Sequence, residues 1–186
     1  MSTLNTVNNL GVLYKNQGKL MEAEEMYQRA LAGKERALGP DHTSSLNTVN
    51  NLGVLYEDQG KLKEAEEMYQ RALTGKERAL GPDHISTLDT VYNLGLLYYN
   101  QGELQEAEEM HQRALAGYER ALGPDHTFTL NIVDNLGLLY KNHGTLEQAE
   151  VTNQPGLAGS QKAAHLNPNR ARRAMERLTR WVKHGR

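Results

Sequence analysis

The sequence of 186 residues contains no cysteine. Disulfide bonds and thiolate metal sites are therefore excluded, which fits a reducing compartment. No apolar run approaches the roughly 20 residues that a membrane-spanning helix needs. The first residues also lack the basic and apolar regions of a secretory signal peptide. These absences lead us to expect a cytoplasmic protein with no membrane span.

Catalytic motifs are missing as well. The sequence has no nucleophile elbow, no glycine-rich phosphate loop and no HExxH zinc motif. We therefore predict that the protein is not an enzyme and that it has neither a cofactor nor a metal site. Repetition supports this prediction, because an active site needs a unique position and most of this chain is repeated.

The dominant feature that is present is a block of 42 residues, written three times and begun a fourth time. Residues 5–46 and 47–88 agree at 36 of 42 positions. A period of this length is typical of repeat proteins, whose units bury their apolar faces only against neighbouring units. One array is thus expected over residues 1–150. Its units are expected at about residues 3–44, 45–86, 87–128 and, incomplete, 129–150.

Each unit carries the pattern of two helices. Two apolar stripes with helical spacing predict a first helix over about residues 4–17 and a second over about 19–38. Asp41, His42 or Thr43 is expected to cap the helix that follows. The stripes consist of Val7, Leu10, Gly11 and Tyr14, and of Leu20, Ala23, Tyr27, Ala30 and Leu31.

Small residues recur at fixed places in both helices. Glycine inside a helix costs about 1 kcal/mol relative to alanine, so its repetition at the position of Gly11 implies a steric need. Gly11 and Ala23 are expected to let two helices approach, with Tyr14 and Tyr27 filling the space beside them. The same argument applies to Gly33, although the sequence suggests no partner for it. The recurring glycines of that second series are Gly33, Gly75 and Gly117.

A signature recurs in the units; in the first it reads Leu10-Gly11-x-x-Tyr14, Gly18, Ala23, Tyr27, Ala30. This signature resembles the tetratricopeptide repeat and covers about residues 3–150. It departs from that family in having Val7 in place of tryptophan, no proline soon after Ala30, and a longer unit. The longer form is similar to the repeats of kinesin light chains and to arrays in fungal nucleotide-binding receptor-like proteins. The resemblance implies an all-α, right-handed α-solenoid whose first helices line a concave groove that binds extended peptides.

Residues beside the core stripe of the first helices form the candidate peptide-binding site. Asparagine is a poor helix former, so an asparagine pair repeated inside helices needs an explanation. A side-chain amide can both donate to and accept from a peptide backbone, and the resemblance implies that role. The alternative is a structural ladder in which Asn9 bonds the next helix. The candidates are Asn8, Asn9, Val12, Asn50, Asn51, Val54, Tyr92, Asn93, Leu96, Tyr99 and Asn135.

Two further residue types are candidates for binding roles. Tyr92 and Tyr99 give the third unit an aromatic character that suits an interface anchor, with simple packing as the alternative. The recurring histidines are too far apart to share a metal ion, so turn and cap roles are predicted for them. They are His42, His84 and His126. The residues at the position of Lys15 are mixed in charge, which argues against a basic clamp for a carboxylate.

Charge divides the chain into two parts, with −9 over residues 1–150 and +7 over residues 151–186. Pro155 interrupts the fourth unit, so residues 151–167 are predicted to form an irregular linker. Residues 168–184 are predicted to form a basic amphipathic helix. Such a helix either caps the last apolar seam of the array or engages an acidic partner, a membrane surface or nucleic acid. The third alternative is that the segment is disordered.

We therefore predict a protein–protein interaction scaffold that binds a protein or peptide ligand. The alternative is a self-assembly or autoinhibitory module in which the basic tail packs on the acidic array. Nucleic acid is the least favoured partner, because the array would repel phosphate. Since the first helix begins almost at Met1, we also expect either a fragment of a longer array or self-association end to end.

Overall fold

The computed structural model describes residues 2–143, and within this range every regular element is an α-helix. The all-α prediction is therefore confirmed. The remaining residues include the predicted linker at 151–167 and the predicted helix at 168–184, which both lie outside the described part. The helices are α1 (Ser2–Asn16), α2 (Leu20–Leu38), α3 (Thr43–Asp58), α4 (Leu62–Leu80), α5 (Ile85–Gln101), α6 (Leu104–Leu122) and α7 (Thr127–His143).

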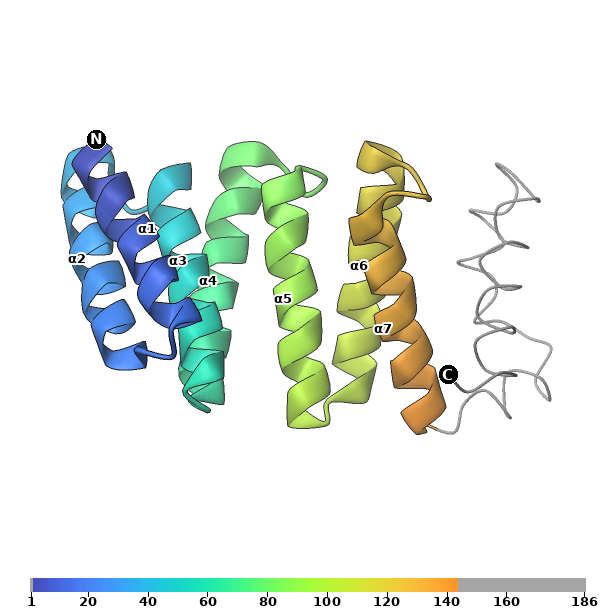
Figure 1. Ribbon diagram of the computed structural model, residues 1–186. Helices are drawn as coiled ribbons and strands as arrows, with labels where there is room; N and C mark the ends of the chain where they lie inside the picture. The colour runs from blue at the N-terminus through green and yellow to red at the C-terminus, as the bar shows by residue number, and fades with distance from the viewer. Residues whose placement is uncertain (1, 144–186) are drawn as a thin grey trace, which may run out of the picture. The chain divides into compact units, whose positions relative to one another are not determined.

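The chain divides into two compact units, residues 1–117 and residues 118–186, with the boundary inside α6. In the first unit, consecutive helices pack against each other from α1 to α5 (Figure 1). The first helices of successive pairs are also neighbours, since α1 contacts α3 and α3 contacts α5. The candidate residues of these three helices therefore form one row in the first unit.

Helix ends follow the turn residues closely. The first predicted helix begins two residues earlier than expected, and the second begins at Leu20. Gly39 ends α2 with a φ of 96°, a backbone conformation that side chains other than glycine rarely adopt. His42 is the N-cap of α3, and its Nδ1 accepts a hydrogen bond from the Ser44 backbone N–H at 3.1 Å. His84 caps α5 in the same way, so the predicted cap role of these two histidines is confirmed.

Close helix contacts explain the recurring glycines. A Cβ atom on Gly11 would lie 2.7 Å from the Tyr27 ring, and one on Gly53 would lie 2.6 Å from the Tyr69 ring. The predicted steric need is thus confirmed. The second glycine series has a leucine as its partner, which the sequence did not reveal. A Cβ on Gly75 would lie 2.5 Å from a methyl group of Leu46.

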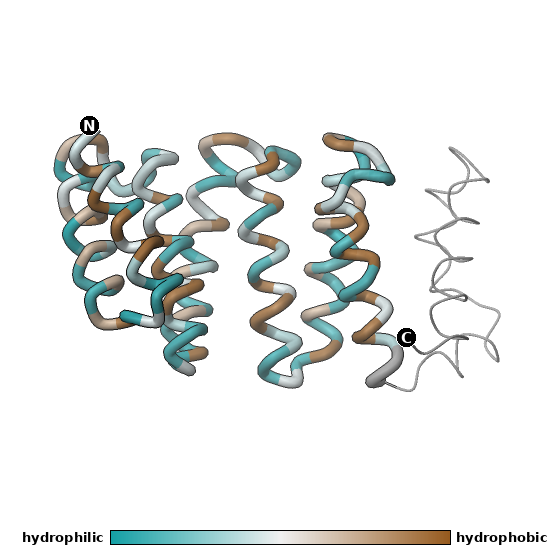
Figure 2. Tube along the Cα trace, viewed as in Figure 1, coloured by the Kyte–Doolittle hydropathy of each residue, from teal (hydrophilic) through white to brown (hydrophobic). Residues whose placement is uncertain are grey.

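Apolar residues occupy separate stripes on the helices, with hydrophilic residues between them (Figure 2). Ala23, Tyr27 and Ala30 of α2 are at most 1% exposed, as are Val49 and Leu55 of α3. The apolar side chains therefore meet where neighbouring helices pack. No helix within residues 2–143 has the length and apolar character needed to cross a membrane.

Candidate functional site

Asparagines of successive first helices are joined by direct hydrogen bonds. The Oδ1 atom of Asn8 on α1 accepts from Thr48 Oγ1 at 3.1 Å and from Asn51 Nδ2 at 3.3 Å, both on α3. The next pair of helices repeats this geometry. Asn50 Oδ1 accepts from Thr90 Oγ1 at 3.0 Å and from Asn93 Nδ2 at 3.4 Å, both on α5.

Each of these threonines accepts a hydrogen bond from a buried lysine. Lys34 on α2 is 3% exposed, and its Nζ donates to Thr48 Oγ1 at 2.9 Å and to the Ser44 carbonyl at 3.2 Å. Lys76 on α4 is 2% exposed and donates to Thr90 Oγ1 and to the Ser86 carbonyl, both at 3.0 Å. We call each connected set a Lys–Thr–Asn relay. The two relays are Lys34–Thr48–Asn8 and Lys76–Thr90–Asn50.

The lysines and threonines of the relays were missed by sequence reasoning. A signal was present, because Lys34 follows Ala30 by four residues and so lies on the apolar face of its helix. Its recurrence as Lys76 strengthens that signal. A charged residue on a core face usually needs a specific polar partner, and the next helix supplies one.

Burial governs the electrostatics of the relays. It lowers the pKa of Lys34, and it lowers the pKa of Lys76 to about 8, against an opposing effect from the charge of Asp89. The ammonium group favours an acceptor, so Thr48 accepts from Lys34 and its own hydroxyl proton is left for Asn8 or the Ser44 carbonyl. This order turns the Oδ1 atom of Asn8 toward the protein interior.

The amide nitrogens of the same asparagines remain available. The hydrogen bonds of Asn8 and Asn50 to other side chains all use Oδ1. Among the residues that the structure describes, neither Nδ2 atom donates a hydrogen bond. Both side chains are half-buried. Each relay therefore fixes an asparagine by its oxygen and presents its N–H₂ donor on the row formed by α1, α3 and α5.

The following asparagines have the complementary arrangement. Asn51 and Asn93 use their Nδ2 atoms to bond the preceding helix, so they retain Oδ1 as an acceptor. The ladder alternative had Asn9 bonding the next helix. The observed bonds run from Asn51 and Asn93 back to the preceding unit, while Asn9 is exposed. Apolar candidates between them are half-buried; these are Val12, Val54 and Leu96.

The aromatic candidates occupy different environments. Tyr92 is half-buried, and its ring centroid lies 5.7 Å from that of His111, with the rings tilted by 52°. Tyr99 is half-buried on the same helix. Tyr98 is 9% exposed and donates to Glu66 Oε1 at 3.3 Å, so it belongs to a contact between units. Asn135 is half-buried on α7, in the second compact unit.

The relay is not repeated in the third unit of the sequence. Tyr92, Tyr118 and Ile132 stand at the positions that correspond to Asn50, Lys76 and Thr90. Within the second compact unit, the Tyr118 ring stacks on Phe128 at a centroid distance of 6.0 Å. The polar part of the row therefore comprises α1 and α3 with their partners on α5.

Charged side chains beside the row already have polar partners. Lys15 Nζ lies 3.3 Å from Asp58 Oδ2. Glu57 accepts from Asn100 at 2.8 Å and from Tyr69 at 3.1 Å, and burial raises the pKa of its carboxyl group. This mixed arrangement differs from a basic clamp. The part of the chain that the structure describes contains no cluster of three His, Asp or Glu side chains suited to a metal ion.

The packing of α1 to α5 defines a helical-repeat protein built from antiparallel helix pairs. The sequence model of the tetratricopeptide repeat matches residues 2–78, 50–118 and 86–159. The chain therefore belongs to the tetratricopeptide repeat family, and the predicted membership is confirmed. Repeats of this family generally mediate protein–protein interaction.

Solved structures show the same fold. BtubC (BKLC) from P. vanneervenii shares 25% sequence identity at a TM-score of 0.73, over 95% of this chain and 64% of that chain. This chain thus spans less than two thirds of the length of BtubC. No curated protein matches the chain.

Two further matches are structures of a Podosopora anserina protein described as having nearly identical TPR-like repeats of a kinesin light chain. They share 23% and 22% identity at TM-scores of 0.71 and 0.72, covering 98% of this chain and 96% and 97% of those chains. These neighbours confirm the predicted all-α helical-repeat solenoid.

Proposed function

We propose that this protein is a non-catalytic scaffold that binds an extended peptide across α1, α3 and α5. The observation that carries the proposal is the pair of Lys–Thr–Asn relays. Each relay holds an asparagine oxygen inward and leaves the amide nitrogen for a ligand. A row of fixed donors suits a peptide backbone, which offers a carbonyl acceptor at every residue.

The acceptors on the row match the same ligand. Asn51 and Asn93 present Oδ1 atoms that are able to accept from peptide N–H groups, next to the donors of Asn8 and Asn50. The half-buried side chains of the apolar candidates between them supply contacts that are indifferent to sequence. Tyr92 adds an aromatic ring at the third helix of the row. Backbone recognition combined with one aromatic anchor predicts modest affinity and broad specificity.

The test distinguishes the two polar groups of Asn50: its N–H₂ group, which is proposed to donate to the peptide, and its oxygen, which bonds the next helix. Asn50→Asp keeps an oxygen for Thr90 and Asn93 but removes the N–H₂ donor. A peptide selected from a random dodecapeptide library on the full chain should bind Asn50→Asp roughly tenfold more weakly, the loss expected for about 1.4 kcal/mol. Fluorescence anisotropy measures this change, and circular dichroism should show unchanged helix content.

Two control variants make the result decisive. Gln105→Glu makes the same amide-to-acid change on the exposed surface of α6, and it should bind the peptide like the wild type. Asn50→Ala removes both donor and acceptor, so it should lose stability as well as binding. If Asn50→Asp binds the selected peptide as tightly as Gln105→Glu does, the asparagine row has only a structural role and the proposal fails.

A further inference from the structure

The first helices of the three units bury the same face to different extents. Leu55 on α3 and Leu97 on α5 are 0% exposed, whereas Leu13, the corresponding residue on α1, is 50% exposed. The difference is one of context, because the helix sequences are nearly the same. In α3 this face packs on α2, so α1 presents an apolar face that its own sequence equivalents bury.

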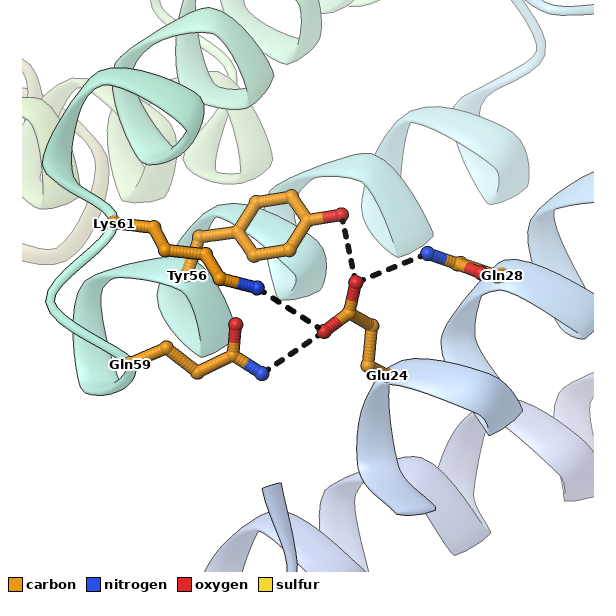
Figure 3. Close-up of polar contacts among 5 residues, drawn as sticks. All are labelled: Glu24, Gln28, Tyr56, Gln59 and Lys61. Atoms are coloured by element: carbon orange, nitrogen blue, oxygen red, sulfur yellow. Dashed lines mark hydrogen bonds and ion pairs between the residues drawn. The ribbon is translucent and has the colours of Figure 1, made fainter. Parts of the chain in front are cut away.

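In the interior of the array, the helix that packs on this face presents a glutamate to it. Figure 3 shows Glu24 of α2 surrounded by side chains from the end of α3 and the turn after it. Its carboxylate accepts from Tyr56 Oη at 3.4 Å and Gln59 Nε2 at 3.0 Å, and it lies 3.5 Å from Lys61 Nζ. Gln28, one turn further along α2, donates to the same carboxylate at 3.1 Å.

The first unit carries the same receptor residues in the same order. Tyr14, Gln17 and Lys19 correspond to Tyr56, Gln59 and Lys61. Lys19 Nζ already lies over the Tyr14 ring, 5.7 Å from its centroid, as Lys61 Nζ lies 5.3 Å from the centroid of the Tyr56 ring. We call the surface formed by Leu13, Tyr14, Gln17 and Lys19 the α1 outer face.

The charge of the α1 outer face selects its partner. Helix α1 contains no acidic residue. Lys19 corresponds to Lys61, which forms the ion pair with Glu24. Two such faces from two molecules would bring lysine against lysine, which disfavours a symmetric contact. The face instead fits a helix that carries a glutamate followed by a glutamine at i+4, with a small residue beside the glutamate to accommodate Leu13.

The sequence of the chain contains that pattern once more, at the start of its incomplete fourth block. Ala149, Glu150 and Gln154 stand at the positions that correspond to Ala23, Glu24 and Gln28, and Pro155 ends the match. We propose that residues 146–154 of a second copy dock on the α1 outer face and join the molecules head to tail. Because the match stops at Pro155, the contact covers only the C-terminal half of α1, so the association is weak.

A head-to-tail contact joins two different surfaces, so it need not close into a ring. The assembly should therefore keep growing as the protein concentration rises. Sedimentation velocity of the full chain from low to high micromolar concentration should show a weight-average coefficient that rises with concentration. Lys19→Glu should stay monomeric, because the docking glutamate then meets a like charge. This substitution suits the fold, since the third unit carries Glu103 at the same position. Glu150→Lys should stay monomeric as well.

Mixing the two single variants identifies the two surfaces. In an equimolar mixture, each charge-changed surface meets an opposite charge on the other variant, so the mixture should regain the concentration-dependent growth that neither variant shows alone. The double variant Lys19→Glu, Glu150→Lys should regain concentration-dependent growth. Met21→Lys is the matched control, because Met21 is 81% exposed and its equivalent in the second unit is Lys63. It should behave like the wild type.

The opposite results overturn the proposal. A wild-type chain that stays monomeric throughout the concentration range has no such contact. Growth that Lys19→Glu leaves unchanged relative to Met21→Lys places the contact elsewhere. A mixture of single variants that remains monomeric shows that these two surfaces do not meet. The test of the peptide-binding proposal is independent of all three outcomes, because Asn50 lies on α3 and is not part of the α1 outer face.

Discussion

At the scale of single residues, one difference between the third unit and its neighbours is a buried histidine. His111 is 1% exposed and occupies the position of Tyr27 and Tyr69. Its Nδ1 atom has no hydrogen-bond partner among the described residues. Burial lowers the pKa of His111 to about 4. The histidine therefore stays neutral in the folded chain under conditions in which an exposed histidine takes up a proton.

This position gives the protein an acid-sensitive point. Between the unfolded pKa of about 6.5 and the folded pKa of about 4, the unfolded chain binds more protons at His111. The free energy of unfolding is therefore not reduced by this residue above the unfolded pKa. It falls as the pH drops toward the folded pKa, by at most about 3 kcal/mol. Urea unfolding over this range should show that His111→Tyr loses less stability than the wild type.

The reciprocal change supplies the control. Tyr69→His should introduce the same acid sensitivity into the second unit, together with a constant loss from the missing hydrogen bond to Glu57. Parallel pH profiles for wild type and His111→Tyr would mean that His111 is protonated in the folded chain without cost. That result would contradict the role of burial.

At the scale of helices, the spacing between partners depends on glycine. Replacing an exposed helical glycine with alanine normally stabilises a helix by about 1 kcal/mol. Gly53→Ala should do the opposite, because its Cβ would lie 2.6 Å from the Tyr69 ring. We expect a loss of about 1–3 kcal/mol in the free energy of unfolding, as for other overpacked sites. Chemical denaturation measures it.

A matched helix substitution shows whether the cost is steric. Thr74→Ala changes an exposed residue of α4 to the residue that the first and third units carry there, Ala32 and Ala116. It should be neutral or slightly stabilising. Gly53→Ala and Thr74→Ala having the same effect would show that the helices can separate freely.

Sequence patterns predicted most features within a helix and fewer of those between helices. The apolar stripes located α1 and α2 to within two residues, and the glycine argument identified the Gly11–Tyr27 contact. Lys34 was missed because its partner Thr48 lies in the following unit, and periodicity within one helix says nothing about that neighbour. The partner of Gly75 was missed because Leu46 lies on the other helix of the same unit, which periodicity within one helix does not describe either.

The candidate asparagines were recognised by their repetition, but their geometry depended on the neighbouring helix. A mid-helix asparagine pair indicated a special role, but it did not show whether each side chain uses its oxygen or its nitrogen to bond the neighbouring helix. The structure shows Asn51 bonding backward to Asn8, an arrangement that depends on the Thr48 hydroxyl between the two helices. Whether the row binds a peptide stays a prediction, to be decided by the Asn50 variants.

At the scale of the whole molecule, near-identity of the units makes the contacts between them interchangeable. The relay that joins the first unit to the second recurs, residue for residue, between the second and the third. The stability of such an array is approximately a sum of unit terms and nearest-neighbour terms. An added unit that forms the same contacts on both sides should therefore stabilise the chain.

Inserting an additional copy of residues 43–84 after His84 tests this additivity. The insertion adds one helix pair and one complete relay, so both the urea midpoint and the m-value should rise, the latter because more surface is exposed on unfolding. The control is the same insertion with alanine in place of the tyrosine copied from Tyr69, which is 0% exposed in the parent chain. It should add length with much less stability, since burying an aromatic ring contributes several kcal/mol. An unchanged midpoint in the first insertion would show that neighbouring units do not stabilise one another, and the contacts between units would then set only their spacing.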